Sequence, residues 1–331
     1  MENIINKDLI DKIEKRELII CENFNSCYEA LKKNIKPLIF IIKYDFLKSE
    51  NFTKLINILI KKIKLDLIYK SKLINNLKES NNIIETNKLK NLIYTIKLNN
   101  QIDQNIFNKY PILKKYFVID KDEKKLKKLS STKTPYSIVG IFYTPENIKI
   151  YEEKRYEGIN NNEIKNLNIE TTLFAFENIQ DPNNLGNIIR TIISFNFKTL
   201  ITIGSSSVYH FSQKVIRSSS GNIFHLNNIF KFEKIETFLT FFKNLGFKFV
   251  SLSLNGENIL NENNLFKILS IPKKIYIFGN EGRGISEKII ENSDYKIKIP
   301  INENVDSLNV GNSVAIIAWE NYKNNIINKN S

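Results

Sequence analysis

In the stretch Asn178–Thr191, N-I-Q-D-P-N-N-L-G-N-I-I-R-T, the sequence of the C-terminal half changes from a strand pattern through a polar turn to a helix pattern. The apolar run before it, Leu173–Phe176, predicts a short buried strand. Asp181-Pro182-Asn183 is turn chemistry, because proline fixes φ and Asp and Asn tolerate tight loops. A helix should follow, with Asn184 as its N-cap and Arg190 on its polar side. The stretch fits an ordinary connection with a solvated arginine, and it also fits the strand-to-helix crevice where open α/β sheets bind ligands.

Two later stretches combine an expected strand or helix with a polar or Gly-rich loop. The first, Ile277–Ser286, reads I-F-G-N-E-G-R-G-I-S, and the second is Ile299-Pro300-Ile301 followed by Asp306–Ala315, D-S-L-N-V-G-N-S-V-A. A P-loop needs lysine where Ile285 stands, and a dinucleotide fingerprint needs glycine where Glu287 stands. Both nucleotide-loop interpretations are therefore weak. What remains is a loop whose glycine backbone can approach a flat ligand closely.

The C-terminal half alternates expected strands with expected helices. This alternation predicts an α/β fold with a mostly parallel sheet and helices on both faces. The expected strands are 173–177, 199–203, 247–252, 274–278 and 295–299, and the expected helices are 184–196, 211–220, 234–245, 261–269 and 307–323.

The N-terminal half reads as a smaller α/β domain. Leu38–Ile42 predicts a strand, 52–63 a helix and Leu65–Tyr69 the next strand, whereas residues 71–115 show no clear boundaries. Residues 146–169 are polar and are interpreted as a linker between a domain at 1–145 and a domain at 170–331.

The chain is strongly basic. Among 331 residues, Lys and Arg number 49 against 35 Asp and Glu, which gives a formal net charge of +14. Such a charge attracts nucleic acid or an acidic membrane surface. Coding bias toward Ile, Lys and Asn explains part of this excess equally well.

The remaining composition excludes several classes of site. Only two cysteines and two histidines are present, without metal-ligand spacing, so we expect no metal and no disulfide framework. The N-terminus carries acids early and lacks an apolar core, which argues against a secretory signal. No uninterrupted apolar run of about 18 residues occurs, so we expect no membrane span and a cytoplasmic location.

Three stretches, Asn178–Thr191, Ile277–Ser286, and Ile299–Ile301 with Asp306–Ala315, resemble in their order and spacing the three motifs of the SpoU/TrmH branch of the SPOUT RNA methyltransferases. Lys214–Gly221, K-V-I-R-S-S-S-G, is similar to that family's K-x-x-R-x-S-x-G segment. In the N-terminal half, Leu129–Ile141 and Glu29–Lys32 resemble parts of the α/β/α RNA-binding domain, like a small ribosomal protein, that many members carry. The resemblance implies a deep trefoil knot made by the last helix, S-adenosylmethionine as cofactor, RNA as partner and a homodimer.

The resemblance also assigns roles to residues, each of which has a plain structural alternative. Asn184 and Ser307 could be helix caps, and Glu281 could be a carboxylate that interacts favourably with a nearby helix start. Gly279 could be a turn residue, and Ile299 and Leu308 could be core residues. Lys214 could be a solvated cation. The implied catalytic residues are Arg190, Asn184, Glu281, Ser307 and Asn309; Gly279, Ile299 and Leu308 would hold the cofactor, and Lys214 and Arg217 the RNA.

The function implied is methylation of a ribose 2′-hydroxyl, with ribosomal RNA as the favoured substrate and transfer RNA as the alternative. A non-catalytic RNA-binding or ribosome-assembly protein on the same scaffold is a further alternative. Arginine is always protonated, so Arg190 acts more readily as a phosphate clamp or as a stabiliser of the developing alkoxide than as a plain base. The sequence leaves the choice among these roles open.

Overall fold

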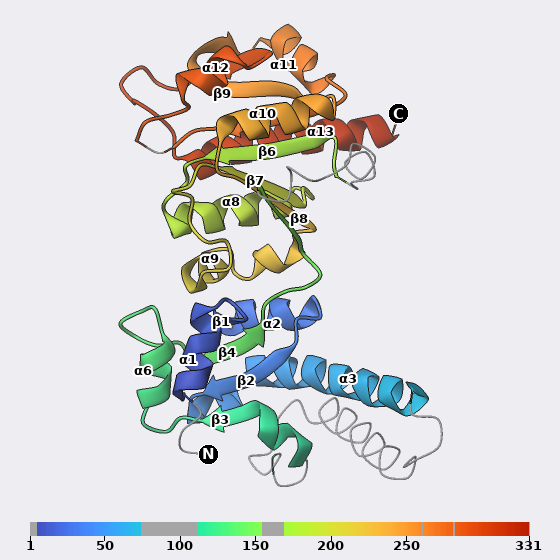
Figure 1. The fold of residues 1–331 in the computed structure, drawn as a ribbon, viewed down its shortest axis with the longest axis vertical. Coiled ribbons are helices and arrows are strands. Elements are labelled where there is room, and N and C mark those ends of the chain that lie inside the picture. The colour runs from blue at the N-terminus through green and yellow to red at the C-terminus, as the bar shows by residue number, and fades with distance from the viewer. Residues whose placement is uncertain are drawn as a thin grey trace. The chain divides into compact units, whose positions relative to one another are not determined.

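The computed structural model describes residues 5–73, 107, 111–153, 169–259, 261–280 and 282–330. The chain divides into two compact units, Met1–Pro145 and Glu146–Ser331, and each unit contains its own sheet (Figure 1).

The N-terminal unit is built on a four-stranded sheet in the order β1-β4-β2-β3. Strand β4 runs antiparallel to both β1 and β2, whereas β2 and β3 are parallel. Strands β1, β2 and β3 therefore all end at the same edge of the sheet. The elements of this unit are α1 Lys7–Glu14, β1 Leu18–Glu22, α2 Phe24–Lys32, β2 Pro37–Ile42, η1 Tyr44–Lys48, α3 Glu50–Leu73, η2 Pro111–Tyr116, β3 Phe117–Ile119, α6 Lys124–Leu129 and β4 Ile138–Tyr143.

The prediction of a strand at Leu65–Tyr69 was wrong. Helix α3 begins at Glu50 and continues to Leu73, past the point at which we expected it to end. Residues 52–69 contain no Gly or Pro, so nothing in the local sequence stops the helix. Residues 71–115, for which the sequence showed no clear element boundaries, lie mostly outside the described residues.

Both cysteines lie in the core of the N-terminal unit. Cys21 and Cys27 are fully buried, and the Cys27 thiol donates to the carbonyl of Cys21 at 3.4 Å. Burial in apolar surroundings disfavours the thiolate and raises the pKa of both thiols.

We therefore expect both thiols to be inert in the folded protein, because alkylation requires an accessible thiolate. Titration with a chromogenic disulfide reagent at neutral pH should detect no reactive thiol in the native protein and both thiols after denaturation. Rapid reaction in the native state would show that this core opens locally.

The C-terminal unit is built on a seven-stranded sheet in the order β11-β9-β10-β6-β7-β8-β5, and every pairing in it is parallel. This confirms the α/β class with a mostly parallel sheet. The elements are β5 Lys149–Glu152, β6 Thr172–Glu177, α8 Pro182–Ser194, β7 Thr199–Ile203, α9 Gln213–Ser218, η4 Asn222–His225, β8 Asn228–Phe232, α10 Ile235–Asn244, β9 Lys248–Asn258, α11 Glu262–Leu269, β10 Lys274–Phe278, α12 Glu287–Glu291, β11 Tyr295–Lys298 and α13 Val310–Asn330.

The central strands are buried on both faces, which explains their continuous apolar runs. Alternate side chains of β6, β7, β8 and β10 pack with the phenylalanines of α10 in one cluster. The side chains between them in each strand, such as Phe174 and Tyr276, lie on the other face of the sheet. There the Tyr276 hydroxyl donates to Asn321 of α13 at 3.2 Å. Helices therefore cover both faces of the sheet, as Figure 1 shows for α10 and α13.

Three elements of this unit differ from the expectation. Lys149–Glu152, which we assigned to a linker, forms the edge strand β5, where Tyr151 stacks on Phe230 with ring centroids 4.5 Å apart. Strand β8 and the five-residue helix α12 were not predicted. Helix α12 gives too few positions for a periodic pattern, and strands β5 and β8 are identified by their parallel pairing in the folded unit.

Gly186 lets α8 and α9 approach each other closely. A Cβ at this position would lie 1.9 Å from Ser218 Oγ and 2.8 Å from the backbone nitrogen of Ser219. Ser218 uses the same contact to donate to the carbonyl of Pro182 at 2.9 Å.

Gly186→Ala should therefore lower the free energy of unfolding by about 1–3 kcal/mol, the usual cost of overpacking a tight contact. Urea unfolding followed by circular dichroism measures this. Gly282→Ala is the matched control, because the nearest atom to its Cβ is 3.6 Å away. Equal stability of the two variants would contradict the packing described for α8 and α9.

Candidate active site

A cavity of about 420 Å³ opens beside the carboxyl ends of β10 and β11. Three loop segments line it: residues between 278 and 285, between 297 and 301, and between 306 and 313, together with Leu252 and Ser253 of β9. Its volume is in the range of pockets that hold small-molecule ligands and cofactors. The lining mixes aliphatic side chains with glycine backbone, which suits a flat ring system with polar edges.

The loop after β10 is folded back on itself. Asn280 and Gly284 exchange two backbone hydrogen bonds of 3.0 Å, and Gly284 has a φ of +70°. A Cβ on Gly279 would lie 2.0 Å from the carbonyl carbon of Gly284, so only glycine fits there. Because Gly279, Gly282 and Gly284 all line the cavity, this loop offers backbone groups to a ligand.

The three residues assigned to cofactor binding lie in the lining of this one cavity. Gly279 belongs to the first segment, Ile299 to the second and Leu308 to the third. Ser307, assigned to catalysis, lines it as well. Within the described residues, three successive segments of the chain thus meet at the carboxyl edge of the parallel sheet, as such folds favour.

Asn184 and Asn309 meet beside the cavity, where Asn309 Nδ2 donates to Asn184 Oδ1 at 3.1 Å. The prediction that Asn184 caps its helix was wrong: Asp181 is the N-cap, accepting from the backbone nitrogen of Asn183 at 2.9 Å, and Pro182 begins α8. Proline suits the first helical position, which moves the helix start ahead of Asn184. The Asn184 side chain is thereby released from capping and reaches the start of α13.

The prediction that Ser307 caps the last helix was also wrong. Helix α13 begins at Val310, and Asn309 Oδ1 accepts from the backbone nitrogen of Gly311 at 2.8 Å. The Asn309 amide thus uses its oxygen for its own helix and its nitrogen for Asn184, which fixes its orientation. Ser307 is exposed in the loop before the helix.

Arg190 lies six residues after Asn184 on α8, about 9 Å further along the helix axis. Its side chain is exposed, it does not line the cavity, and no described residue bonds to its guanidinium. The structure therefore brings Asn184, Ser307 and Asn309 to the cavity region but leaves Arg190 facing solvent. Glu281 lies outside the described residues.

Lys214 and Arg217 lie on α9, which packs against α8. Lys214 is exposed and Arg217 half-buried, and neither lines the cavity. Phe211, just before this helix, is buried and serves the core.

Sequence reasoning missed the residues that tie the loops together. Asn280 Nδ2 donates to the carbonyl of Asn178 at 2.8 Å, while Asn280 Oδ1 accepts from Gly282 at 2.9 Å. Glu177, buried at the end of β6, accepts from the backbone nitrogen of Ser286 at 2.9 Å. A carboxylate as the last residue of one predicted strand and an asparagine two residues after another are the sequence signal that could have identified them.

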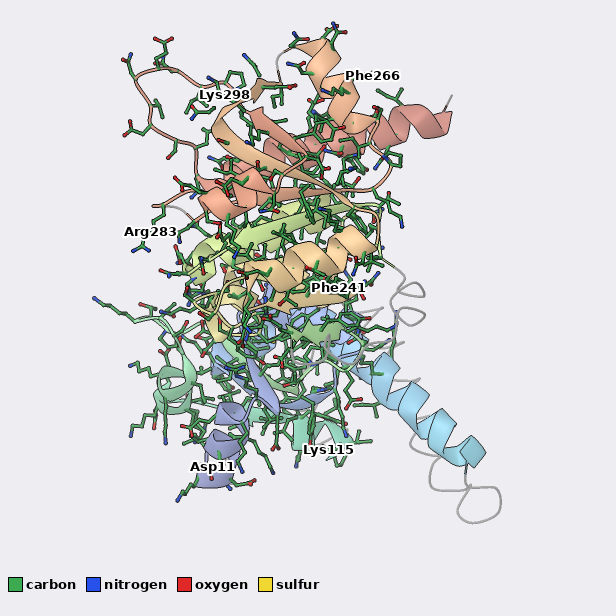
Figure 2. The ribbon with its side chains drawn as sticks, turned by 45° about the horizontal axis from the view of Figure 1, so that its top comes forward. Asp11, Lys115, Phe241, Phe266, Arg283 and Lys298 are labelled. Atoms are coloured by element: carbon green, nitrogen blue, oxygen red, sulfur yellow. The ribbon has the colours of Figure 1, made fainter. Side chains whose placement is uncertain are left out.

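A second, more polar cavity of about 380 Å³ adjoins the first and shares Asn280, Arg283 and Gly284 with it. Glu177, Asn178 and Ser206 also line it. Two cations border the first cavity, Arg283 and Lys298, and Figure 2 shows both on the same side of the unit.

The described residues contain no group of three His, Cys, Asp or Glu side chains arranged to hold a metal. They also contain no helix with the length and apolarity needed to cross a membrane.

Comparison with known proteins identifies the family. Residues 171–319 match the SpoU rRNA Methylase family. An uncharacterized tRNA/rRNA methyltransferase from Borreliella burgdorferi is 33% identical over 175 residues, which cover 47% of this chain and 73% of that protein. The chain belongs to the SpoU/TrmH family.

Other relatives differ in the extent of the match. The 23S rRNA (guanosine(2553)-2′-O)-methyltransferase of Bacillus subtilis is 24% identical over 194 residues, which cover 58% of this chain and 66% of that protein. For three relatives at 30–34% identity the match covers between 60% and 73% of their length. A crystal structure of an rRNA methyltransferase from Sinorhizobium meliloti, 16% identical, superposes with a TM-score of 0.60 over 98% of this chain and 96% of that one, and so shares the fold of this SpoU protein.

Proposed function

We propose that this protein transfers the methyl group of S-adenosylmethionine to a ribose 2′-hydroxyl of RNA, with ribosomal RNA as the substrate. The observation that carries the proposal is the cavity in which Gly279, Ile299, Ser307 and Leu308 meet beside the Asn184–Asn309 pair. The Bacillus subtilis relative is named for 2′-O-methylation of a 23S rRNA guanosine, which supports both the ribose and the rRNA.

The cavity fits the cofactor on its own chemistry. Its aliphatic lining, which includes Ile297, Ile299 and Leu308, suits an adenine ring, and the glycine backbone of the loop after β10 suits the polar edge of that ring. The cations Arg283, which is exposed, and Lys298, which is half-buried, border the cavity and are placed to pair with a carboxylate of the cofactor. When bound, S-adenosylmethionine supplies an electrophilic methyl carbon on its sulfonium.

The residues of this chain supply position and charge. The Asn184–Asn309 pair, locked by its mutual hydrogen bond, presents amide groups that orient a ribose, and Ser307 adds a hydroxyl nearby. Arg190, exposed and unbonded by the described residues, is free to bind an RNA phosphate bidentately. We assign it this clamp role and a share in stabilising the negative charge that develops on the ribose oxygen. Glu281 is proposed as a catalytic residue on the family motif alone.

The substrate is tested by measuring transfer of radiolabelled methyl from S-adenosylmethionine into purified rRNA and tRNA from cells that lack this protein. We expect label in rRNA. Label in tRNA alone would show that the substrate is tRNA and not rRNA. Label in neither RNA, with intact cofactor binding, would favour a non-catalytic RNA-binding role.

We further propose that the chain works as a cytoplasmic homodimer, with its last helix threaded as a trefoil knot. The dimer proposal is supported by apolar side chains that α13 leaves uncovered: Ile316, Trp319, Ile326 and Ile327 are 37%, 48%, 42% and 56% exposed. Exposed apolar groups repeated on one helix indicate a surface that associates.

Trp319→Lys should convert the dimer to a monomer, because the substitution places a charge in an apolar interface. Light scattering after size exclusion measures the mass. Phe266→Lys is the control, since Phe266 is 72% exposed on a different helix, α11. A wild-type monomer, or a Trp319→Lys dimer, would contradict the proposal.

A further inference from the structure

The second cavity of the C-terminal unit is lined mainly by side chains that form hydrogen bonds. Its volume is about 380 Å³, and it shares Asn280, Arg283 and Gly284 with the cavity proposed for the cofactor. The other lining residues are Glu177, Asn178, Gln180, Ser206 and Ser286. A chemical group held here therefore lies next to the cofactor and is recognised by hydrogen bonds more than by apolar contact.

Glu177 is the buried acidic group of this cavity. It is the last residue of β6 and is 4% exposed. Its Oε2 accepts from the backbone nitrogen of Ser286 at 2.9 Å, and among the described residues this is the only hydrogen bond of the carboxylate. A carboxylate has about four acceptor positions, and leaving them unfilled in a buried place is costly. The second oxygen, Oε1, therefore favours a ligand that brings hydrogen-bond donors.

Asn178 places a fixed amide in the same cavity. Its φ of +51° ends the alternation of side chains along β6, so Glu177 and Asn178 line one cavity although they are consecutive. Ser206 Oγ donates to Asn178 Oδ1 at 2.9 Å. Gly204 leaves room for that oxygen, because a Cβ on Gly204 would lie 2.0 Å from it. With its oxygen held in this way, the amide offers its Nδ2 as a donor, which bonds to no residue of the described part of the chain.

A carboxylate beside an amide donor distinguishes guanine from the other RNA bases. Unpaired bases are read on their Watson–Crick edges, where guanine presents two adjacent donors, N1–H and N2–H₂, followed by the acceptor O6. Adenine, cytosine and uracil each present an acceptor directly beside their donor, and a carboxylate repels that acceptor. The same negative charge repels phosphate. The pair of Glu177 and Asn178 therefore fits a guanine base.

A purely structural role explains only part of this arrangement. The bond from Ser286 to Glu177 Oε2 ties the loop after β10 to the end of β6. It leaves Oε1 of Glu177 and Nδ2 of Asn178 without a use, although both side chains line the cavity. The hydroxyl of Ser286 is also buried, and it has no hydrogen-bond partner among the described residues. Buried polar groups without partners call for an explanation, and a polar ligand provides one.

We infer that the second cavity holds the base of the nucleotide to be methylated and that this base is guanine. In this arrangement Glu177 accepts from N1–H and N2–H₂, and Asn178 Nδ2 donates to O6. The inference rests on the proposed function, because it names the base attached to the ribose that receives the methyl group. The ribose then lies where the two cavities meet, beside Asn280, Arg283 and Gly284. Glu177 determines specificity and takes no part in methyl transfer.

The base preference is tested on the full-length wild-type protein saturated with S-adenosylmethionine. The probes are the 5′-monophosphates of guanosine, inosine, adenosine, cytidine and uridine, each titrated in a saturation-transfer NMR experiment. Inosine differs from guanosine only by the missing 2-amino group. Guanosine monophosphate should bind about tenfold or more tightly than each of the others, in line with a paired contact to a base edge. Equal affinity for the guanosine and inosine nucleotides would overturn the inference, and so would no binding of any nucleotide at millimolar concentration.

Glu177→Gln tests the carboxylate itself. The variant keeps the size of the side chain and one oxygen for the Ser286 nitrogen, but a donor replaces the free acceptor. Affinity for guanosine monophosphate should fall about tenfold or more, and the preference over inosine monophosphate should disappear. Thermal unfolding shows whether the variant keeps its fold. A wild-type preference in a folded Glu177→Gln protein would show that Glu177 does not read the base.

Glu170→Gln is the matched control. Glu170 is half-buried just before β6, at the opposite end of the strand from Glu177, and it also accepts from a backbone nitrogen, that of Lys198. It does not line the second cavity. This variant should keep the wild-type preference for guanosine monophosphate. Equal losses in the two variants would assign the effect to a general disturbance of β6 and would overturn the inference.

Two outcomes separate this inference from the proposed function. If the protein selects guanosine monophosphate through Glu177 but transfers no methyl group to RNA, the base site stands and the proposed function fails. If rRNA is methylated on a ribose 2′-oxygen but the modified nucleoside is adenosine, cytidine or uridine, the proposed function stands and the inference fails alone. The expected product is 2′-O-methylguanosine, identified by mass spectrometry of the digested RNA.

Discussion

Arg190→Ala should reduce the rate of methyl transfer to RNA by about 100-fold or more and leave the affinity for S-adenosylmethionine nearly unchanged. The first effect is expected because loss of one positioned donor to developing charge typically costs a factor of about 100 to 1,000. The second is expected because Arg190 lies outside the cavity lining and its guanidinium bonds to no described residue. Single-turnover kinetics and isothermal calorimetry with the cofactor measure the two quantities separately.

Two other variants define which property of Arg190 matters. Arg190→Lys keeps the charge but loses the planar fork that binds phosphate bidentately, so an intermediate rate is expected. Lys214→Ala removes an exposed cation from the neighbouring helix α9 and should weaken RNA binding while the rate at saturating RNA is kept. Full activity of Arg190→Ala would exclude Arg190 from catalysis.

Gly279→Ala should weaken binding of S-adenosylmethionine by about tenfold or more. The added Cβ would lie 2.0 Å, 2.2 Å and 2.3 Å from backbone atoms of Gly284 and Ile285, which are not flexible side-chain ends. Relieving an overlap of this kind costs about 1–3 kcal/mol, and each 1.4 kcal/mol is a factor of ten in affinity. The loop has to open, and its glycines then no longer line the cavity as they do now.

Gly282→Ala is the control within the same loop. Gly282 also lines the cavity, but its Cβ would meet nothing closer than Asn280 Oδ1 at 3.6 Å. We expect its cofactor affinity to stay within about threefold of the wild type, a difference well below one factor of ten. Isothermal calorimetry with S-adenosylmethionine measures the affinity of the wild type, Gly279→Ala and Gly282→Ala. Equal affinities would show that the tight loop geometry does not matter for cofactor binding.

The sequence predicted those parts of the fold that carry a long periodic signal. Alternation of apolar strands with amphipathic helices indicated the parallel sheet, and the buried runs such as Leu173–Phe176 were placed within it. The three cavity segments could be found because each is a short motif at the end of a strand or the start of a helix. The segments after β10 and β11 meet at one edge because both strands run parallel to β9 between them.

Other features depend on contacts between distant residues. Asn184 was expected to cap a helix, but it bonds to Asn309, which lies 125 residues away in the sequence. Local propensity alone cannot choose between Asp181 and Asn184 as a cap, and the observed helix begins at Pro182. Strand β5 exists only because it pairs with β8.

In the N-terminal unit, too, the local sequence leaves some features undecided. The apolar residues Leu65–Tyr69 fit a strand as well as a helix, and only the uninterrupted run of α3 resolves the choice. The buried carboxylates Glu22 and Asp120 gave no signal in the sequence, because a carboxylate in an apolar setting reads as exposed until its partner is known.

The most direct test of the account is the identity of the methylated atom. The protein is incubated with rRNA from cells that lack it and with S-adenosylmethionine carrying a deuterated methyl group, and the RNA is then digested to nucleosides for mass spectrometry. Deuterium is expected on a ribose 2′-oxygen, and Arg190→Ala should form this product about 100-fold more slowly or slower still. Deuterium on a base, or an unlabelled RNA in the presence of bound cofactor, would contradict it.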